Sequence, residues 1–472
     1  MTQSPFADAS GTVATIGLFN RPPLAPATFV IFGATGDLAM RKLIPALYNL
    51  TKDGLLPDDF DVLCVARTDM DYRRFMERLR NGVARHSRSG IDDDAWSRLG
   101  ARVDYHRMDY DAKADYEGLR AKLGMKEAHN RRRRFVFYLF TPPTSFPSII
   151  EGLGANGIVT PAHHGDGPPT RVVFEKPFGR DAASAVALNR AAAKWLDEDQ
   201  LFRMDHYLGK ETVQNILIFR FANAIFEPLW NRRYVHHVRI TAFEKIGIEG
   251  RGRFYEETGI IRDVLQNHLL QILALCAMEP PASFDTERIR DERAKVFGAL
   301  RPLEVAGDSI SLGRYAGYLD EKDVAKDSTT PTFASVKLFI DNWRWAGVPF
   351  ILSTGKALRD KQTQIDVHFG PVPLCLFKEQ EICTKMAPNV LTIRIQPEEG
   401  ITLRFCAKTP GDRQDVSPVT MDFDFQHRFK DNAQQEAYEK LLLDCLRGNQ
   451  TLFARQDEVE SMWRFVARIQ NF

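Results

Sequence analysis

The sequence contains no apolar run that approaches the ~20 residues of a transmembrane helix, so we expect no membrane span. Its N-terminal residues lack the basic flank and continuous apolar stretch of a signal peptide. The net charge is also small, because 63 lysines and arginines balance 62 aspartates and glutamates. Nothing in the composition therefore indicates nucleic acid or an anionic membrane as a partner. What is present is typical of a globular protein: 44% of the 472 residues are hydrophobic and 26% are charged.

Cysteine is scarce as well, with six in the chain and no C-x-x-C pair. Most lie among apolar neighbours, which is typical of reduced core thiols and predicts a cytoplasmic protein. They are Cys64, Cys276, Cys375, Cys383, Cys406 and Cys445. The histidine pairs at residues 163–164 and 236–237 have no cysteine or carboxylate at ligand spacing, so we predict no metal site.

The N-terminal part carries a pattern for binding phosphate groups. Residues 28–32 form an apolar run that predicts a buried parallel strand, and apolar residues at helical spacing begin at Leu43. Between them lies the stretch Gly33-Ala34-Thr35-Gly36-Asp37-Leu38-Ala39. A strand, a glycine turn and a helix in this order predict a pyrophosphate site at the helix N-terminus. The alternative is a tight glycine turn in another kind of βαβ unit.

The second predicted strand, residues 61–67, ends in Arg67. Enzymes that use NAD usually carry a carboxylate at this place, whereas an arginine accommodates the 2′-phosphate of NADP. Arg67 therefore favours NADP as the coenzyme. The alternative is a solvated loop arginine.

Strand-like and helical runs alternate as far as residue 174, which predicts a doubly wound parallel sheet. From about residue 310 onward, strand-like runs follow one another with short turns. That arrangement predicts an antiparallel sheet with one face covered.

Two short peptides concentrate side chains that can do chemistry. The first, Glu175-Lys176-Pro177-Phe178-Gly179, places Lys176 at the end of a predicted strand, where it can meet both coenzyme and substrate. A structural salt bridge is the alternative for that lysine. The second is Arg203-Met204-Asp205-His206-Tyr207-Leu208-Gly209-Lys210-Glu211, which gathers a carboxylate, an imidazole, a phenol and an ammonium. We expect it to hold a phosphorylated substrate beside the coenzyme.

A long apolar helix is predicted at residues 258–278, with Asp263, Asn267 and His268 as a small polar patch. At α-helical spacing Asp263 and Asn267 lie one turn apart on one face, and His268 is the next position round. Buried polar side chains need partners, so the patch is either a satisfied core network or the lining of a site. The charged peptide at residues 203–211 favours the site.

Taken together and in this order, these motifs resemble the glucose-6-phosphate dehydrogenase family over nearly all of residues 28–470, and Gln266-Asn267-His268-Leu269-Leu270-Gln271 adds to the match. The resemblance implies a Rossmann-like NADP-binding domain at 28–205. Residues 1–27 fall outside the match, and their small, polar and proline-rich composition predicts a flexible segment. It implies a larger α+β domain at 206–472, with a mainly antiparallel sheet that forms a homodimer or homotetramer. The implied reaction is NADP-dependent oxidation of glucose 6-phosphate at C1 to 6-phospho-D-glucono-1,5-lactone, the first step of the oxidative pentose phosphate pathway.

The resemblance also implies a role for each site residue. His268 would be the base that removes the proton of the 1-hydroxyl, and Asp205 would orient it. The residues implied to bind substrate are Lys176, His206, Tyr207, Lys210, Glu244, Asp263, Lys356 and Lys361. Those implied to bind coenzyme are Gly33, Ala34, Thr35, Gly36, Asp37, Leu38, Arg67 and Lys176. Two alternatives are a Rossmann-type oxidoreductase acting on another sugar or sugar phosphate, and a non-catalytic NADP-binding scaffold.

Overall fold

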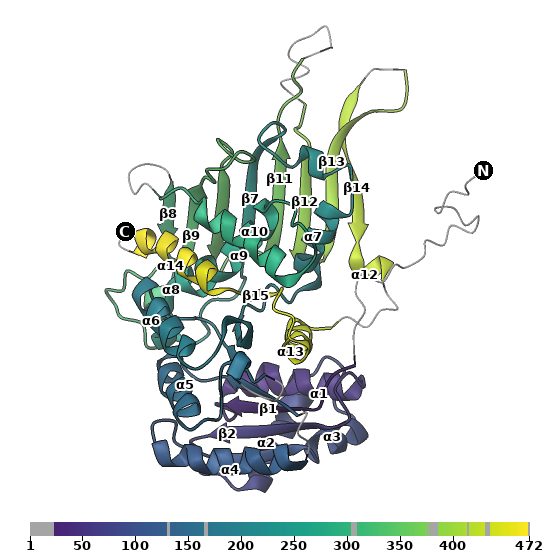
Figure 1. Cartoon of the computed structure of the whole chain (residues 1–472). Helices are drawn as coiled ribbons and strands as arrows, with labels where there is room; N and C mark the ends of the chain where they lie inside the picture. Colours follow the sequence, from purple (N-terminus) through teal and green to yellow (C-terminus); the bar gives the residue numbers. More distant parts are fainter. Residues whose placement is uncertain are drawn as a thin grey trace, which may run out of the picture.

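The computed structural model describes residues 23–129, 133–164, 169–303, 309–374, 376, 386–412, 415–429 and 435–470. Most of the N-terminal segment predicted to be flexible, and Cys375 and Cys383, therefore lie outside the described residues. The chain forms two β-sheets, one near each end of the molecule in Figure 1, with helices packed on both. None of the helices in the described part has the length and apolar character that a bilayer-spanning segment requires.

The first sheet has seven strands in the order β15-β6-β5-β4-β1-β2-β3. Its parallel strands are β1 (Ala27–Phe32), β2 (Phe60–Ala66), β3 (Val103–Arg107), β4 (Arg134–Leu139), β5 (Arg171–Phe174) and β6 (Leu201–Met204). Most of their residues are buried on both faces, as expected of a parallel sheet covered by helices. The predicted doubly wound sheet is confirmed.

The connections of this sheet are helical. They are η1 (Ala39–Leu43), α1 (Ile44–Lys52), α2 (Tyr72–His86), α3 (Asp93–Gly100), α4 (Lys113–His129), α5 (Phe146–Ala155) and α6 (Ala182–Ala193), with short turns η2 (Pro143–Ser145), η3 (Ala162–His164) and η4 (Glu198–Gln200). An aspartate caps α2, because the Asp71 side chain accepts from the N–H groups of Arg73 and Arg74.

The second sheet has eight strands in the order β14-β13-β12-β11-β7-β10-β9-β8. They are β7 (Val235–Phe243), β8 (Ile310–Gly313), β9 (Phe333–Leu338), β10 (Phe350–Gly355), β11 (Gln362–Phe369), β12 (Val390–Gln396), β13 (Gly400–Lys408) and β14 (Val416–Asp424). Only β7 and β10 pair in parallel. In β9 and β11 buried and partly exposed residues alternate, because one sheet face carries helices. The predicted, mainly antiparallel sheet is confirmed.

Helices α7 (Glu211–Phe221), α9 (Leu270–Ala277) and α10 (Thr286–Gly298) lie in front of this sheet in Figure 1. Smaller elements are η5 (Glu227–Leu229), η7 (Tyr318–Asp320) and α12 (Phe425–Arg428).

The predicted long helix at 258–278 differs in form from the expectation. It is built from α8 (Gly252–Ile260), a π-helix η6 (Ile261–Leu269) and α9, with a kink at Gly259, where φ is 59°. A π-helix bonds each N–H to the carbonyl five residues earlier, so its turn is wider than that of an α-helix. The predicted position of Asp263 and Asn267 on one face stays a prediction, and the wide turn lies at the candidate site.

Apolar residues at helical spacing also predict amphipathic surface helices at residues 438–446 and 458–469, which the structure contains as α13 (Ala437–Arg447) and α14 (Gln456–Gln470). The predicted surface position was wrong for α13, in which most side chains are buried. In Figure 1 it lies between the two sheets. A Cβ added at Gly209 would lie 2.7 Å from the Ala437 carbonyl oxygen, so α13 packs directly on the peptide 203–211. Beyond α13, β15 (Phe453–Ala454) pairs with β6 and closes one edge of the first sheet.

Candidate active site

The peptide 203–211 passes from the end of strand β6 into two tight turns. Strand β6 ends at Met204, and two tight turns follow, in which Leu208 N donates to the carbonyl of Asp205 and Lys210 N to that of Tyr207. The Asp205 side chain also accepts from Tyr207 N at 2.9 Å. Ligands bind at the carboxyl ends of strands in such sheets, and these turns point several polar side chains to one place there.

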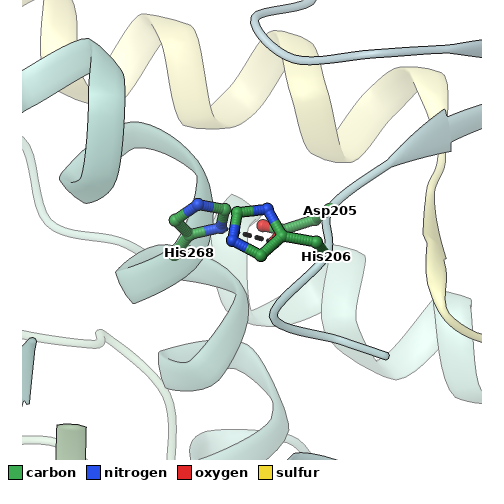
Figure 2. A group of neighbouring side chains, drawn as sticks. All are labelled: Asp205, His206 and His268. Carbon is green, nitrogen blue, oxygen red and sulfur yellow. Dashed lines mark hydrogen bonds and ion pairs between the residues drawn. The ribbon is translucent and has the colours of Figure 1, made fainter. Parts of the chain in front are cut away.

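Asp205 and His268 meet although they are 63 positions apart in the sequence. His268 Nδ1 lies 2.5 Å from Asp205 Oδ1, and the two side chains are only 2% and 5% exposed. Figure 2 shows them with His206 beside them. Burial lowers the pKa of His268 well below its usual range, and the charge of Lys176 lowers it further. The imidazole is therefore neutral at neutral pH, with its proton on Nδ1 toward the carboxylate and its basic lone pair on Nε2.

Lys176 lies against that basic atom. It follows β5, the strand beside β6, and its Nζ is 2.9 Å from His268 Nε2. It also donates to the carbonyl and carboxylate of Asp263, at 2.9 and 3.2 Å. The preceding Glu175 has other partners, since its carboxylate accepts from the hydroxyls of Tyr138 and Tyr438. The ammonium of Lys176 thus lies between His268 and Asp263, and its side chain is 25% exposed.

A second lysine completes a small ionic group at the end of the other sheet. Lys356 follows β10 and Glu244 follows β7, and they form an ion pair because these strands are parallel neighbours. Lys356 Nζ also lies 3.4 Å from Asp263 Oδ2. Burial raises the pKa of Asp263, but Lys176 and Lys356 outweigh that effect and hold it well below its usual range. Asp263 and Glu244 thus present ionised oxygens that can accept from sugar hydroxyls.

The remaining residues of the peptide surround His268 on its other sides. The ring of Tyr207 stacks on His268 with centroids 4.1 Å apart, and the ring of His206 lies 4.4 Å away, edge to face. Burial lowers the pKa of Lys210 to about 8, and Lys361 contributes to the lowering through its charge. A partly desolvated lysine beside a histidine and a phenol is suited to an anion.

Sequence reasoning missed two residues of this cluster. Gln396, at the end of β12, accepts from Lys210 Nζ at 2.6 Å and lies 3.4 Å from the hydroxyl of Tyr207. Tyr438 lies on α13, and its ring is stacked 6.3 Å from that of His206. The only local signal for Gln396 was its place at the end of a strand before a proline, and nothing local marked Tyr438.

Asp205, His206 and His268 also have ligand atoms within 4.8 Å of one another, a spacing that could hold a metal ion. The charges around them favour an anion instead, because Lys176, Lys210 and Lys356 all lie close enough to lower the pKa of His268. The absence of a metal stays a prediction.

The glycine turn after β1 lies between a strand and a helix, an order that suits a bound pyrophosphate. Gly33 has a φ of 78°, and a Cβ there would lie 2.4 Å from the carbonyl oxygen of Phe140. Its N–H donates to the hydroxyl of Tyr110 at 2.9 Å, and a helical segment follows from η1 into α1. The turn therefore fits a coenzyme pyrophosphate at a helix start. Among its other residues, Ala34 is buried, Thr35 is partly exposed, and Gly36, Asp37 and Leu38 are exposed.

Arg67 follows β2 beside this turn. Its side chain is exposed, and its guanidinium lies 5.6 Å from the centroid of the Tyr110 ring. The position fits an arginine that meets a ribose 2′-phosphate.

Comparisons with known proteins agree over residues 30–472. A family model described as "Glucose-6-phosphate dehydrogenase, NAD binding domain" matches residues 30–215, and one described as "Glucose-6-phosphate dehydrogenase, C-terminal domain" matches residues 217–472. The chain is 42% identical to the glucose-6-phosphate 1-dehydrogenase of Chlamydia pneumoniae over 95% of its own length and 90% of that protein. It is also 42% identical to the Bacillus subtilis enzyme of that name, over 94% and 91%.

Solved structures give the same result. One of glucose-6-phosphate dehydrogenase in complex with its substrate glucose-6-phosphate superimposes with a TM-score of 0.88 at 36% identity, covering 96% of this chain and 93% of the other. The glucose-6-phosphate 1-dehydrogenase of Mycobacterium avium superimposes with a TM-score of 0.84 at 36% identity, covering 95% and 92%.

Proposed function

The chain belongs to the glucose-6-phosphate dehydrogenase family, and on that basis we propose that it oxidises glucose 6-phosphate at C1 with NADP, yielding 6-phospho-D-glucono-1,5-lactone. The observation that carries the proposal is the contact of Lys176 and Asp205 with opposite nitrogens of His268, at 2.9 and 2.5 Å. A neutral histidine with one nitrogen held by a carboxylate and its lone pair on the other nitrogen is arranged to accept a proton.

His268 is the proposed general base. The 1-hydroxyl of the sugar donates its proton to Nε2 as the C1 hydrogen leaves with its electron pair, and the C1–O bond becomes the lactone carbonyl. NADP, when bound, supplies the acceptor for that hydride. The Asp205 carboxylate stabilises the imidazolium that forms. Nε2 accepts from Lys176 in this structure, so the sugar hydroxyl has to enter between the two groups.

The 6-phosphate is proposed to bind to His206, Tyr207 and Lys210. Arrival of a dianion raises the pKa of Lys210 again from about 8, which keeps the ammonium charged. Glu244 and Asp263 are proposed to accept from sugar hydroxyls, with Lys356 and Lys361 as further substrate contacts. Binding at the phosphate then holds C1 against His268.

NADP is proposed to bind along the first sheet. Its pyrophosphate lies at the turn of residues 33–38 and its 2′-phosphate at Arg67, while Lys176 lies between nicotinamide and sugar. The division into a coenzyme domain at 28–205 and a substrate domain at 206–472 is part of this proposal.

We further propose a homodimer or homotetramer that associates through the second sheet, a cytoplasmic location, and a place at the first step of the oxidative pentose phosphate pathway. The second sheet supports association of subunits. The residues of β11 on its outward face are only partly exposed, and they are Gln362, Gln364, Asp366 and His368.

Absorbance of the reduced nicotinamide tests the reaction. Purified protein is given NADP or NAD with glucose 6-phosphate, and then with free and nucleotide-linked sugars. Reduction of NADP with glucose 6-phosphate is the expected result. Reduction only with another sugar would favour a different Rossmann-type oxidoreductase, and no reduction with any sugar or sugar phosphate would leave the scaffold alternative.

A further inference from the structure

Arg78 reaches the glycine turn from the helix that follows β2. It lies on α2, and its Nη2 donates to the carbonyl oxygen of Thr35 at 3.2 Å. Thr35 is in the middle of the turn between β1 and η1. A guanidinium has five N–H donors, so this one contact leaves others for a ligand. The side chain of Arg78 is exposed, which leaves those donors accessible.

Hydrogen bonds connect Arg78 to the place where Arg67 lies. The hydroxyls of Thr35 and Thr68 are 3.2 Å apart, and Thr68 is the residue after Arg67. The carbonyl of Thr68 accepts from the hydroxyl of Tyr105 at 2.5 Å. The glycine turn, the end of β2 and the side chain of Arg78 therefore converge on one spot.

The local charge is consistent with an anion there. Within the described residues, neither Arg67 nor Arg78 forms an ion pair with a carboxylate, whereas Arg73 and Arg80 on the same helix pair with Glu77 and Asp93. Burial raises the pKa of Tyr105, and Asp69 raises it further, while Arg107 and Arg78 lower it through their charge. Among the charges that act on Tyr105 in this way, Asp69 is accompanied by two arginines.

We propose that Arg78 is a second arginine for the 2′-phosphate of NADP, acting with Arg67 beside the Thr35–Thr68 contact. The inference depends on the proposed function, because it deepens the coenzyme site assigned there. A 2′-phosphate is dianionic and offers three oxygens, and planar guanidinium groups match that geometry better than ammonium groups do. Arg78 is thus a residue that determines specificity for NADP over NAD.

Calorimetric titration tests this without turnover. The probes are 2′,5′-ADP, which carries the phosphate, and NADP and NAD as whole coenzymes. Replacing Arg78 with alanine is expected to weaken the binding of 2′,5′-ADP and NADP by roughly 10-fold or more, as loss of a charge-assisted hydrogen bond would. The affinity for NAD should stay within about twofold of its original value. Arg78→Lys should recover part of the loss. Arg80→Ala is the matched control, because Arg80 lies on the same helix and bonds Asp93 instead, and it should change none of the three.

An equal loss for NADP and NAD in Arg78→Ala would overturn the inference, because Arg78 would then only support the turn through the Thr35 carbonyl. Unchanged binding of 2′,5′-ADP would overturn it too. Both results are distinct from failure of the proposed function, which would appear as no NADP reduction by the unmodified protein with glucose 6-phosphate.

Discussion

Replacing His268 with asparagine removes the nitrogen that is proposed to accept the proton of the substrate. Asparagine can keep a contact to Asp205, but it offers no basic atom where Nε2 now lies 2.9 Å from Lys176. General-base catalysis is worth about 10²–10⁴-fold, or ~2.7–5.5 kcal/mol of activation free energy, so kcat should fall at least ~100-fold. The 6-phosphate contacts are separate side chains, so KM for glucose 6-phosphate should change little.

The assay is steady-state reduction of NADP over a range of pH. His268 must be neutral to act, and burial lowers its pKa below the usual range, so kcat of the unmodified enzyme should fall on the acid side, where the imidazole becomes protonated. This fall at acid pH should be absent from the pH profile of the residual activity of His268→Asn. Circular dichroism and NADP binding establish that the variant is folded.

His206→Asn is the matched control, because its ring lies 4.4 Å from that of His268 in the same cluster. It should raise KM while leaving kcat within about tenfold, as expected for loss of a contact made equally in ground and transition states. Near-normal kcat in His268→Asn would refute the assignment of the base.

Three further outcomes are expected. Arg67→Ala should weaken the binding of NADP by at least ~10-fold and that of NAD far less, as measured by coenzyme titration. Equal losses of affinity for the two coenzymes would contradict the role of Arg67 at the 2′-phosphate. Lys210→Ala should raise KM for glucose 6-phosphate and also lower turnover. In the unmodified enzyme this KM should rise as pH passes about 8, because the Lys210 ammonium is charged below its pKa and neutral above it. A KM that does not change with pH would argue against phosphate binding at Lys210. Glu458→Ala should lower the free energy of unfolding by about 3–5 kcal/mol in denaturant titration. The substitution leaves the buried guanidinium of Arg293 without the carboxylate that now lies 3.0 Å from its Nε. Asp320→Ala, which breaks an exposed pair with Lys326, should cost less than ~1 kcal/mol, and similar losses in the two variants would contradict this reasoning.

The coenzyme site was the most predictable part of the chain. A strand, a glycine turn and a helix are contiguous, so the stretch from Thr28 to Leu50 carries its own pattern of apolar residues and glycine. The same holds for the alternation of strands and helices in the first sheet and for the succession of strands in the second. The roles implied for His268, Asp205 and the lysines came from motifs, and kinetics have still to test them.

What the sequence by itself determined is therefore local: which segments become strands and helices, and which of them carry charge at their ends. Tertiary structure decided which ends meet. Asp205 bonds His268 because β6 ends beside η6, and Lys176 reaches the same imidazole because β5 is the neighbour of β6. The wide turn of η6, the contact of Gln396 with Lys210 and the burial of α13 against the site had no local pattern to mark them. Periodicity reports which face of a segment is apolar, whereas the partner of a polar side chain is set by strand order and packing over tens or hundreds of residues.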